Sequence, residues 1–339
     1  MNEERKNINK EELFLSIGLD HPDSVVLRWI RARKWNIDQA LEQFYQTILW
    51  RSKRNLKQIL SDGEFGLNED EISTGKTTFI GFDKMGRPIN YVSVRDHIRG
   101  QFDLQSTEKL TIFIMETARK LLHSPMETVT VIFDMSDFSL RNMDYQHVKF
   151  LIHLLESFYP ESLGLVLIVN APWIFNSCWL LIKSWIDPVV QNKIQFIKNF
   201  NDLLQYIDQT VLPKRLNGLQ SNFIYIPPTE KDHLMFKTFR NDFHGENQSK
   251  NDHYLAIDYF IQITSQWIQI LNQNQDKQDF YSIEQQRFKS IQQLKDKFEN
   301  RLPYLHTQTH YHRIHMINET IFHSLYQKIS QIESEKLNK

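Results

Sequence analysis

The fold is decided between residues 159 and 175, where the chain has the sequence YPESLGLVLIVNAPWIF. The run Leu165–Val169 is apolar at every position, so it would bury both faces of a strand, as central strands of parallel sheets do. Pro160 lacks the amide hydrogen that a helix needs, and it therefore ends the helix expected near Asp144–Phe158. A helix, a buried strand and a further apolar segment thus follow one another directly.

Segments upstream continue this alternation. Thr77–Phe82 and Ile89–Val94 flank a turn rich in Asp, Gly and Pro, which predicts a β-hairpin. A helix capped by Thr107 and a strand at Val129–Asp134 are expected next. Strands that alternate with helices predict an α/β fold with a mostly parallel sheet and crossover helices.

The segment Ala171–Asp187 is apolar on nearly every side of a helix, and Lys183 is its only charge before Asp187. A helix of this kind is normally buried on every side. Alternatively, it faces a lipid-filled cavity on one side and a bilayer on the other. Cys178 lies within it and is expected to be a buried thiol instead of a nucleophile.

The N-terminal region is predicted to be helical and basic. One helix begins at Pro22-Asp23-Ser24, and a second one, capped by Asp38, follows. Between Ser24 and Lys57 eight basic residues outnumber two acidic ones. This excess indicates either an ordinary solvated helical face or a contact with anionic lipid.

The region after Pro227-Pro228 is rich in Gln and Asn and predicts two to four helices that pack on the main body. Apolar stripes run through His253–Leu271 and through Ile291, Leu294 and Phe298. We therefore expect an N-terminal helical subdomain at 1–75, a sheet domain at 76–226 and a C-terminal helical extension at 227–339.

Composition excludes several classes of protein. The 339 residues carry 40 Lys and Arg against 41 Asp and Glu, so no nucleic-acid partner is expected. A single cysteine excludes intrachain disulfides and zinc sites built on several thiolates. The charged start of the chain has no secretory h-region, and no stretch is apolar for long enough to span a membrane. We expect a cytoplasmic protein.

Catalytic and metal-binding patterns fail on inspection. No Gly-x-Ser-x-Gly elbow is present, and Gly75-Lys76-Thr77 lacks the first glycine of a phosphate loop, where Asp70 stands. His306 and His310 have the spacing of metal ligands on a helix, but packing histidines are favoured. We predict no enzyme, no metal and no cofactor.

Two charges stand at the ends of the apolar segment. Glu161 precedes the buried strand, and Lys193 follows Asp187-Pro188. Each could be an ordinary charge at the end of a loop. Together they could hold a polar head group while apolar walls hold its tails.

Four ordered motifs resemble those of the CRAL-TRIO lipid-transfer family over about residues 24–220, most closely its fungal phosphatidylinositol-transfer branch. They are a basic entry helix, a D-x-x-G-R-P turn, the core signature and a closing motif in which Leu219 replaces the second glycine. The matching segments are Leu27–Trp35, Asp83–Pro88, Tyr159–Gly164, Ile168–Phe175, Asp187-Pro188 with Lys193-Ile194, and Leu212–Gly218.

The resemblance implies a helical N-terminal subdomain, a sheet that floors a lipid cavity, and a mobile gate helix, here Phe175–Ile186. The residues carried over as contacts to the phosphatidylinositol head group are Arg33, Lys34, Asp83, Pro88, Glu161 and Lys193. Those of the gate and acyl cavity are Phe175, Trp179, Ile182, Trp185 and Ile186. Val190 replaces a threonine of the family, so one hydroxyl contact would be missing.

Members of the family that also bind phosphatidylcholine use hydroxyl groups on the hairpin and on the strand that ends at an aspartate like Asp134. The aligned residues here are Val129, Val131, Phe79 and Asn90, with Tyr91 as a substitute if the register slips by one. Because those hydrogen bonds are lost, we expect weak or absent phosphatidylcholine binding.

The resemblance therefore implies a non-enzymatic carrier that exchanges phosphatidylinositol between membranes and touches anionic membrane surfaces transiently. Two alternatives stay open. One is a lipid-sensing regulatory protein that presents its C-terminal helices to a protein partner. The other is a carrier of a neutral ligand such as a sterol or an isoprenoid.

Overall fold

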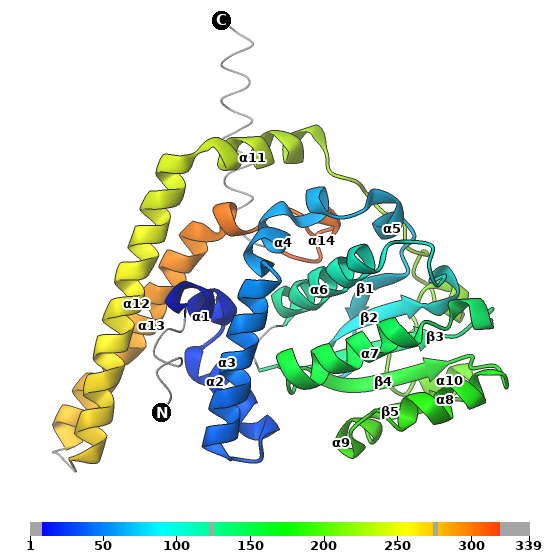
Figure 1. Ribbon diagram of the computed structural model, residues 1–339, viewed down its shortest axis with the longest axis horizontal. Coiled ribbons are helices and arrows are strands. Elements are labelled where there is room, and N and C mark those ends of the chain that lie inside the picture. The colour runs from blue at the N-terminus through cyan, green and yellow to red at the C-terminus, as the bar shows by residue number, and fades with distance from the viewer. Residues whose placement is uncertain (1–8, 123–124, 274–276, 319–339) are drawn as a thin grey trace, which may run out of the picture. The chain divides into compact units, whose positions relative to one another are not determined.

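The computed structural model describes residues 9–122, 125–273 and 277–318, which form two units (Figure 1). The helical unit comprises residues 9–62, 228–273 and 277–308, and the sheet unit comprises residues 63–122, 125–227 and 309–318. None of the helices in the described ranges is long and apolar enough to cross a membrane.

The sheet unit is built on five strands in the spatial order β1-β2-β3-β4-β5. β1 pairs with β2 in antiparallel fashion, and the pairs β2–β3, β3–β4 and β4–β5 are parallel. The predicted hairpin, the buried strand and the mostly parallel α/β sheet are confirmed. The strands are β1 (Thr77–Phe82), β2 (Pro88–Ser93), β3 (Val129–Asp134), β4 (Leu163–Val169) and β5 (Ile194–Ile197).

Helices precede, connect and follow these strands. They are α5 (Glu69–Ser73), α6 (Leu104–Leu121), α7 (Tyr145–His153) with a π-helical turn at Leu154–Phe158, α8 (Phe175–Lys183), α9 (Pro188–Gln191), α10 (Phe200–Leu203) and α14 (His310–Arg313).

The prediction that Thr107 caps a helix is wrong. Asp103 caps α6, because its side chain accepts the amide hydrogens of Gln105 and Ser106. Thr107 lies one turn inside the helix, and its hydroxyl donates to Glu71 at 2.5 Å.

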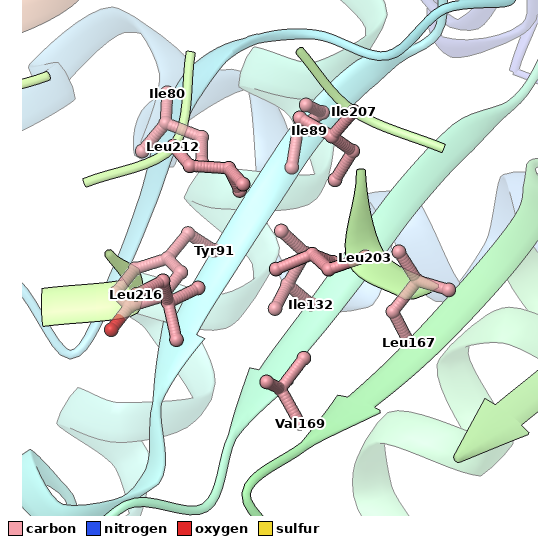
Figure 2. Packing of buried hydrophobic residues seen from close by; sticks show 10 residues of the cluster. All are labelled: Ile80, Ile89, Tyr91, Ile132, Leu167, Val169, Leu203, Ile207, Leu212 and Leu216. Carbon is pink, nitrogen blue, oxygen red and sulfur yellow. The ribbon is translucent and has the colours of Figure 1, made fainter. Parts of the chain in front are cut away.

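One face of the sheet is closed by the chain that follows β5. Figure 2 shows side chains from this chain segment meeting those of the strands. The buried members of this sealed face are Ile80, Ile89, Tyr91, Ile132, Leu167, Val169, Leu203, Ile207, Leu212 and Leu216. Five of them have no measurable exposure, so this face is a closed core: Ile89, Ile132, Leu167, Ile207 and Leu212.

The opposite face, here called the α8 face, packs against α7 and α8. It contains nine buried apolar residues and thirteen that are only partly buried. The sealed face contains ten buried apolar residues and six that are partly buried. The α8 face is therefore the less completely covered side of the sheet.

The structure excludes one of the two interpretations of the segment Ala171–Asp187. Phe175, Cys178 and Ile182 are buried in the α8 face, whereas Leu180 is 71% exposed and Leu181 44% exposed. Burial of this helix on every side is therefore wrong, because only one stripe of a nine-residue helix meets the sheet. The prediction that Cys178 is a buried thiol is confirmed.

The helical unit joins the two ends of the chain in one core. Phe14, Ile17 and Val25 pack with Ile257 and Ile291 in a single cluster. α12 and α13 lie side by side (Figure 1). The helices are α1 (Lys10–Ile17), α2 (Pro22–Ala32), α3 (Ile37–Lys53), α4 (Leu56–Asp62), α11 (Glu230–Asn241), α12 (Phe243–Asn272) and α13 (Lys277–Leu305).

The predicted start of α2 at Pro22 is confirmed, but the predicted cap of α3 is wrong. Asn36, and not Asp38, caps α3, since the side-chain oxygen of Asn36 accepts the amide hydrogen of Gln39 at 3.0 Å. Asp38 lies in the first turn, where its charge suits the positive end of the helix dipole.

Charged groups link α1 to the C-terminal helices of this unit. Glu11 is paired with Arg301, with Lys250 at 3.2 Å and with Lys57 at 3.5 Å. Burial raises the pKa of Glu11, but the hydrogen bond and charge of Arg301 and the other cations outweigh it and lower the pKa to about 2. The C-terminal extension is therefore part of the structure around α1.

The C-terminal histidines pack against neighbouring groups. His310 is buried, its ring lies 5.0 Å from that of Phe223, and its Nδ1 accepts the amide hydrogen of Ile226. Burial lowers its pKa to about 4. Within the described ranges no group of three or more His, Cys, Asp or Glu side chains could hold a metal ion.

Candidate functional site

Four of the six candidate head-group residues lie at one edge of the sheet. β2 begins at Pro88, β4 begins two residues after Glu161, and β5 begins directly after Lys193. Because β2, β4 and β5 run in the same direction, their amino ends lie at the same edge. Asp83 belongs to the turn that leads into β2. The fold thus brings these residues to the end of the sheet at which the parallel strands begin. We call this end the amino edge.

Glu161 is an exposed carboxylate in a strained backbone position. Its φ of 56° is left-handed, which costs a residue with a side chain roughly 1–2 kcal/mol. Its side chain has no hydrogen bond or ion pair to the described residues. Strain combined with an unused charge is typical of a ligand contact.

Lys193 is a partly buried cation at the same edge. Its ammonium group donates to the carbonyl oxygen of Leu163 at 2.8 Å, and its own carbonyl oxygen accepts the amide hydrogen of Val166. The described part of the chain offers it no carboxylate partner. Two of its three donors therefore stay free for a ligand.

Asp83 and Pro88 shape the turn between β1 and β2. The buried carboxylate of Asp83 accepts the amide hydrogens of Met85 and Arg87, both at 2.9 Å, and the hydroxyl hydrogen of Thr130 at 2.6 Å. Pro88 is buried and opens β2. The carboxylate of Asp83 is thus largely committed to the turn.

Arg87, in the same turn, was missed among the candidate residues. Its Nε is buried without a hydrogen-bond partner, and the described residues give its side chain no carboxylate. This Nε lies 3.0 Å from the point where a Cβ on Gly164 would stand. The pairing of β3 with β4 shifts register at Gly164, so a bulged glycine makes room for the arginine. The arginine of the D-x-x-G-R-P turn was the available sequence signal.

Arg33 and Lys34 belong to the helical unit and not to the sheet unit. Arg33 caps the end of α2, and Lys34 follows with a left-handed φ of 50°. Both side chains are exposed, and neither has a partner among the described residues.

The five residues predicted for the gate and acyl cavity all lie in the α8 face. Phe175 and Ile182 are buried, and Trp179, Trp185 and Ile186 are partly buried. Three of them make ring contacts with aromatic residues elsewhere in this unit. The distances between ring centroids are 5.5 Å for Phe175 and Phe138, 5.1 Å for Trp179 and Phe196, and 5.8 Å for Trp185 and Tyr145.

α7 completes this face without burying any of its residues. Val148 and Ile152 on α7 contact the α8 face but stay partly accessible. In contrast, α6 buries ten residues over its eighteen. Apolar side chains that remain accessible beside a sheet can take up an apolar ligand.

The residues aligned with choline-lipid contacts offer few hydroxyl groups. Val131 is apolar and lies in the α8 face, and the side-chain amide of Asn90 donates to Thr77 and Thr78. Tyr91 lies in the sealed face, where its hydroxyl donates to Asp134 at 2.6 Å. The tyrosine hydroxyl is thus engaged away from the α8 face.

Comparison with known proteins gives a consistent result. A family model described as CRAL/TRIO domain matches residues 72–218, and one described as CRAL/TRIO, N-terminal domain matches residues 2–45. The CRAL-TRIO domain-containing protein C3H8.02 of Schizosaccharomyces pombe is 36% identical over 91% of this chain and 69% of its own length. The phosphatidylinositol transfer protein CSR1 of Eremothecium gossypii is 34% identical over 89% of this chain and 70% of its own length.

The crystal structure of Sfh5 is similar with a TM-score of 0.48 and 18% identity, over 60% of this chain and 70% of that one. The family assignment rests on the sequence matches, which extend through both units of the chain. With the motifs in their expected order and the sheet as described, the protein is a member of the CRAL-TRIO family.

Proposed function

We propose that the protein binds phosphatidylinositol and exchanges it between membranes without a chemical reaction. The observation that carries this proposal is the pairing of a partly covered apolar face with unpaired charges at the amino edge of the same sheet. The protein's similarity to CSR1 of Eremothecium gossypii, a phosphatidylinositol transfer protein, supports it.

The apolar face supplies what the lipid tails need. Exposing one methylene to water costs about 0.8 kcal/mol, so two chains of roughly thirty methylenes would cost about 25 kcal/mol. Side chains of α7, α8 and the strands would replace the bilayer interior for these chains. The amphipathic α8, with Leu180 and Leu181 exposed, would serve as the gate.

The amino edge supplies contacts for the head group. Glu161 can accept hydrogen bonds from inositol hydroxyls, and Lys193 can donate to the phosphate. In this proposal Asp83 and Pro88 hold the turn that borders the site. The apolar Val129 and Val131 offer no hydroxyl to a choline lipid, so phosphatidylcholine binds weakly.

Mass spectrometry of the lipids that co-purify with the protein tests this function. We expect phosphatidylinositol to dominate the extract. An extract dominated by choline lipids, or by sterols, would contradict the proposal.

Substitution of the amino-edge charges tests the site. Glu161→Ala and Lys193→Ala should each lower phosphatidylinositol transfer between vesicles by about tenfold or more, because each removes a charge-assisted hydrogen bond. The control is Lys198→Ala, since Lys198 is an exposed cation directly after β5. Unchanged transfer in Glu161→Ala and Lys193→Ala would favour a neutral ligand.

A lipid-dependent protein contact is a second candidate function, favoured by α12. Leu255 and Ile268 are two of six large apolar side chains that this helix exposes, and exposed apolar surface that gathers into a patch marks interaction sites. Loss of a co-purifying partner in Leu255→Ser, with transfer unchanged, would support this second role.

A further inference from the structure

The turn between α2 and α3 has a fixed backbone and an exposed set of side chains. Lys34 and Trp35 both have left-handed φ angles, 50° and 66°. The turn is closed by hydrogen bonds from the Trp35 amide to Ile30 at 2.9 Å and from the Asn36 amide to Arg33 at 3.0 Å. The turn therefore holds an unfavourable conformation with its backbone groups satisfied.

Apolar side chains project from this turn into solvent. Trp35 is 66% exposed, and Ile37 and Leu41, one helical turn apart on α3, are 52% and 53% exposed. Trp29 on α2 is only 7% exposed and packs on Phe44. Two tryptophans six residues apart thus have opposite environments, and the outward one is in the strained turn.

Unpaired cations surround these apolar residues. Arg33 and Lys34 precede Trp35 directly, are exposed and have no partner within the described ranges. The nearby acid Asp38 lies in the first turn of α3, at the positive end of the helix. The turn therefore presents positive charge and apolar surface together.

We propose that the α2–α3 turn, with Arg33, Lys34, Trp35, Ile37 and Leu41, docks the protein on the surface of an anionic bilayer. Tryptophan favours the membrane interface, and basic side chains favour anionic head groups. A protein partner is less well matched, because the exposed cations and apolar side chains are confined to one tight turn and the first turns of α3.

In this proposal Arg33 and Lys34 contact phosphate groups of the bilayer, and not the head group of the carried lipid. Both a carried lipid and a bilayer present phosphate groups, but the exposed tryptophan beside the two cations favours the bilayer. The proposal goes beyond lipid transfer and does not depend on which lipid is carried. The two sources of phosphate can be separated by measuring docking and lipid content independently.

Vesicle co-sedimentation of the full chain tests docking. Binding to vesicles with 30 mol% phosphatidylserine, a roughly physiological anionic content, should exceed binding to pure phosphatidylcholine vesicles. Arg33→Glu with Lys34→Glu should weaken binding on the order of 20-fold or more, at about fivefold for each basic residue removed. Trp35→Ser should weaken it about tenfold.

Matched controls come from the same helical unit. Lys237→Glu with Lys289→Glu makes the same change in charge at exposed lysines of α11 and α13, and Tyr281→Ser removes an exposed aromatic side chain of α13. These variants should bind vesicles as the unchanged protein does. Equal losses in the controls would mean that docking is not located in the turn.

Two further measurements complete the test. The difference in fluorescence between the unchanged protein and Trp35→Phe should shift to the blue on anionic vesicles and be quenched by brominated acyl chains. The lipid that co-purifies with the Arg33 and Lys34 variant should be unchanged. Loss of that lipid with normal docking would return both residues to the head-group site, and absent vesicle binding by the unchanged protein would refute the proposal.

Discussion

The two faces of the sheet bury similar types of residue to different extents. On the sealed face the chain after β5 covers the strands, and Ile132 has no exposure. On the α8 face Val131, its neighbour on β3, is only partly buried, as is Ile152 on α7. One strand therefore contributes to a closed core on one side and to an accessible apolar surface on the other. Apolar content alone does not separate a stabilising core from a ligand surface; coverage does.

The largest expected effect comes from truncation of the sealed face. Ile132→Ala should destabilise the protein by about 3–4 kcal/mol, because it leaves a cavity in a closed core. Ile152→Ala, the same change on the α8 face, should cost about 1 kcal/mol. Urea unfolding checks both values, and equal losses would remove the distinction between the two faces.

Low pH should destabilise the packing of α7 on the α8 face, because it protonates His147. Desolvation of its partly buried ring, followed by the charges of His97 and Lys76, lowers the pKa of His147 on α7 to about 4, while Asp144 and Glu71 act in the opposite direction. The unfolded chain binds this proton near pH 6.5, whereas the folded protein binds it only near pH 4. The contribution of neutral His147 to the free energy of unfolding is therefore fully present above pH 6.5 and is lost as the pH falls towards 4. The loss reaches at most about 3 kcal/mol.

Hydrogen exchange measured from pH 7 to pH 4 checks this expectation. The amides of α7 should lose protection before those of β3. His147→Gln should reduce the slope of the unfolding free energy in this range, and the slope that remains comes from other histidines with lowered pKa values, such as His253 and His310. An unchanged slope would show that His147 is not the responsible group.

Larger side chains at Ile132 and Val131, which lie on opposite faces of β3, should have different effects: the first should lower stability and the second should lower the amount of bound lipid. Ile132→Trp should cost about 1–3 kcal/mol through overpacking. Val131→Trp should be tolerated, but should reduce co-purified lipid by about tenfold because it fills space that the acyl chains would occupy. Unfolding curves and lipid mass spectrometry, measured on both variants, check the pair.

The smallest effect is expected on the outer side of α8. Leu180→Gln should change the unfolding free energy by no more than about 0.5 kcal/mol, since this side chain is exposed. Ile182→Gln, which places a polar group in the buried stripe of the same helix, should cost more. Equal effects in thermal unfolding would mean that α8 is not amphipathic in its packing.

Local pattern was sufficient for the strands but not for the helix caps. Val129–Asp134 was predicted with the bounds that β3 has, because apolar and β-branched runs bounded by polar residues select a strand locally. Thr107 and Asp38 were wrong as caps. Several residues near each helix can cap it, and the packing that fixes its first turn selects among them.

The candidate site was predictable in part. Glu161 and Lys193 could be chosen because they stand at the two ends of the apolar segment, Glu161 before the buried strand and Lys193 after Asp187-Pro188. Their common edge follows from the parallel pairing of β4 and β5. Arg87 escaped attention, since its environment depends on a register shift at Gly164, 77 positions away along the chain, and register is set by pairing between strands.

The sequence by itself determined the alternation of strands and helices, the family, and the basic character of the region around α2. These features depend on hydrogen bonding and periodicity over a few residues. Only the tertiary structure decided which apolar residues are sealed, which way Trp29 and Trp35 face, and that Glu11 pairs with Arg301. Burial and charge pairing depend on segments that are distant in sequence, and folding alone brings those segments together.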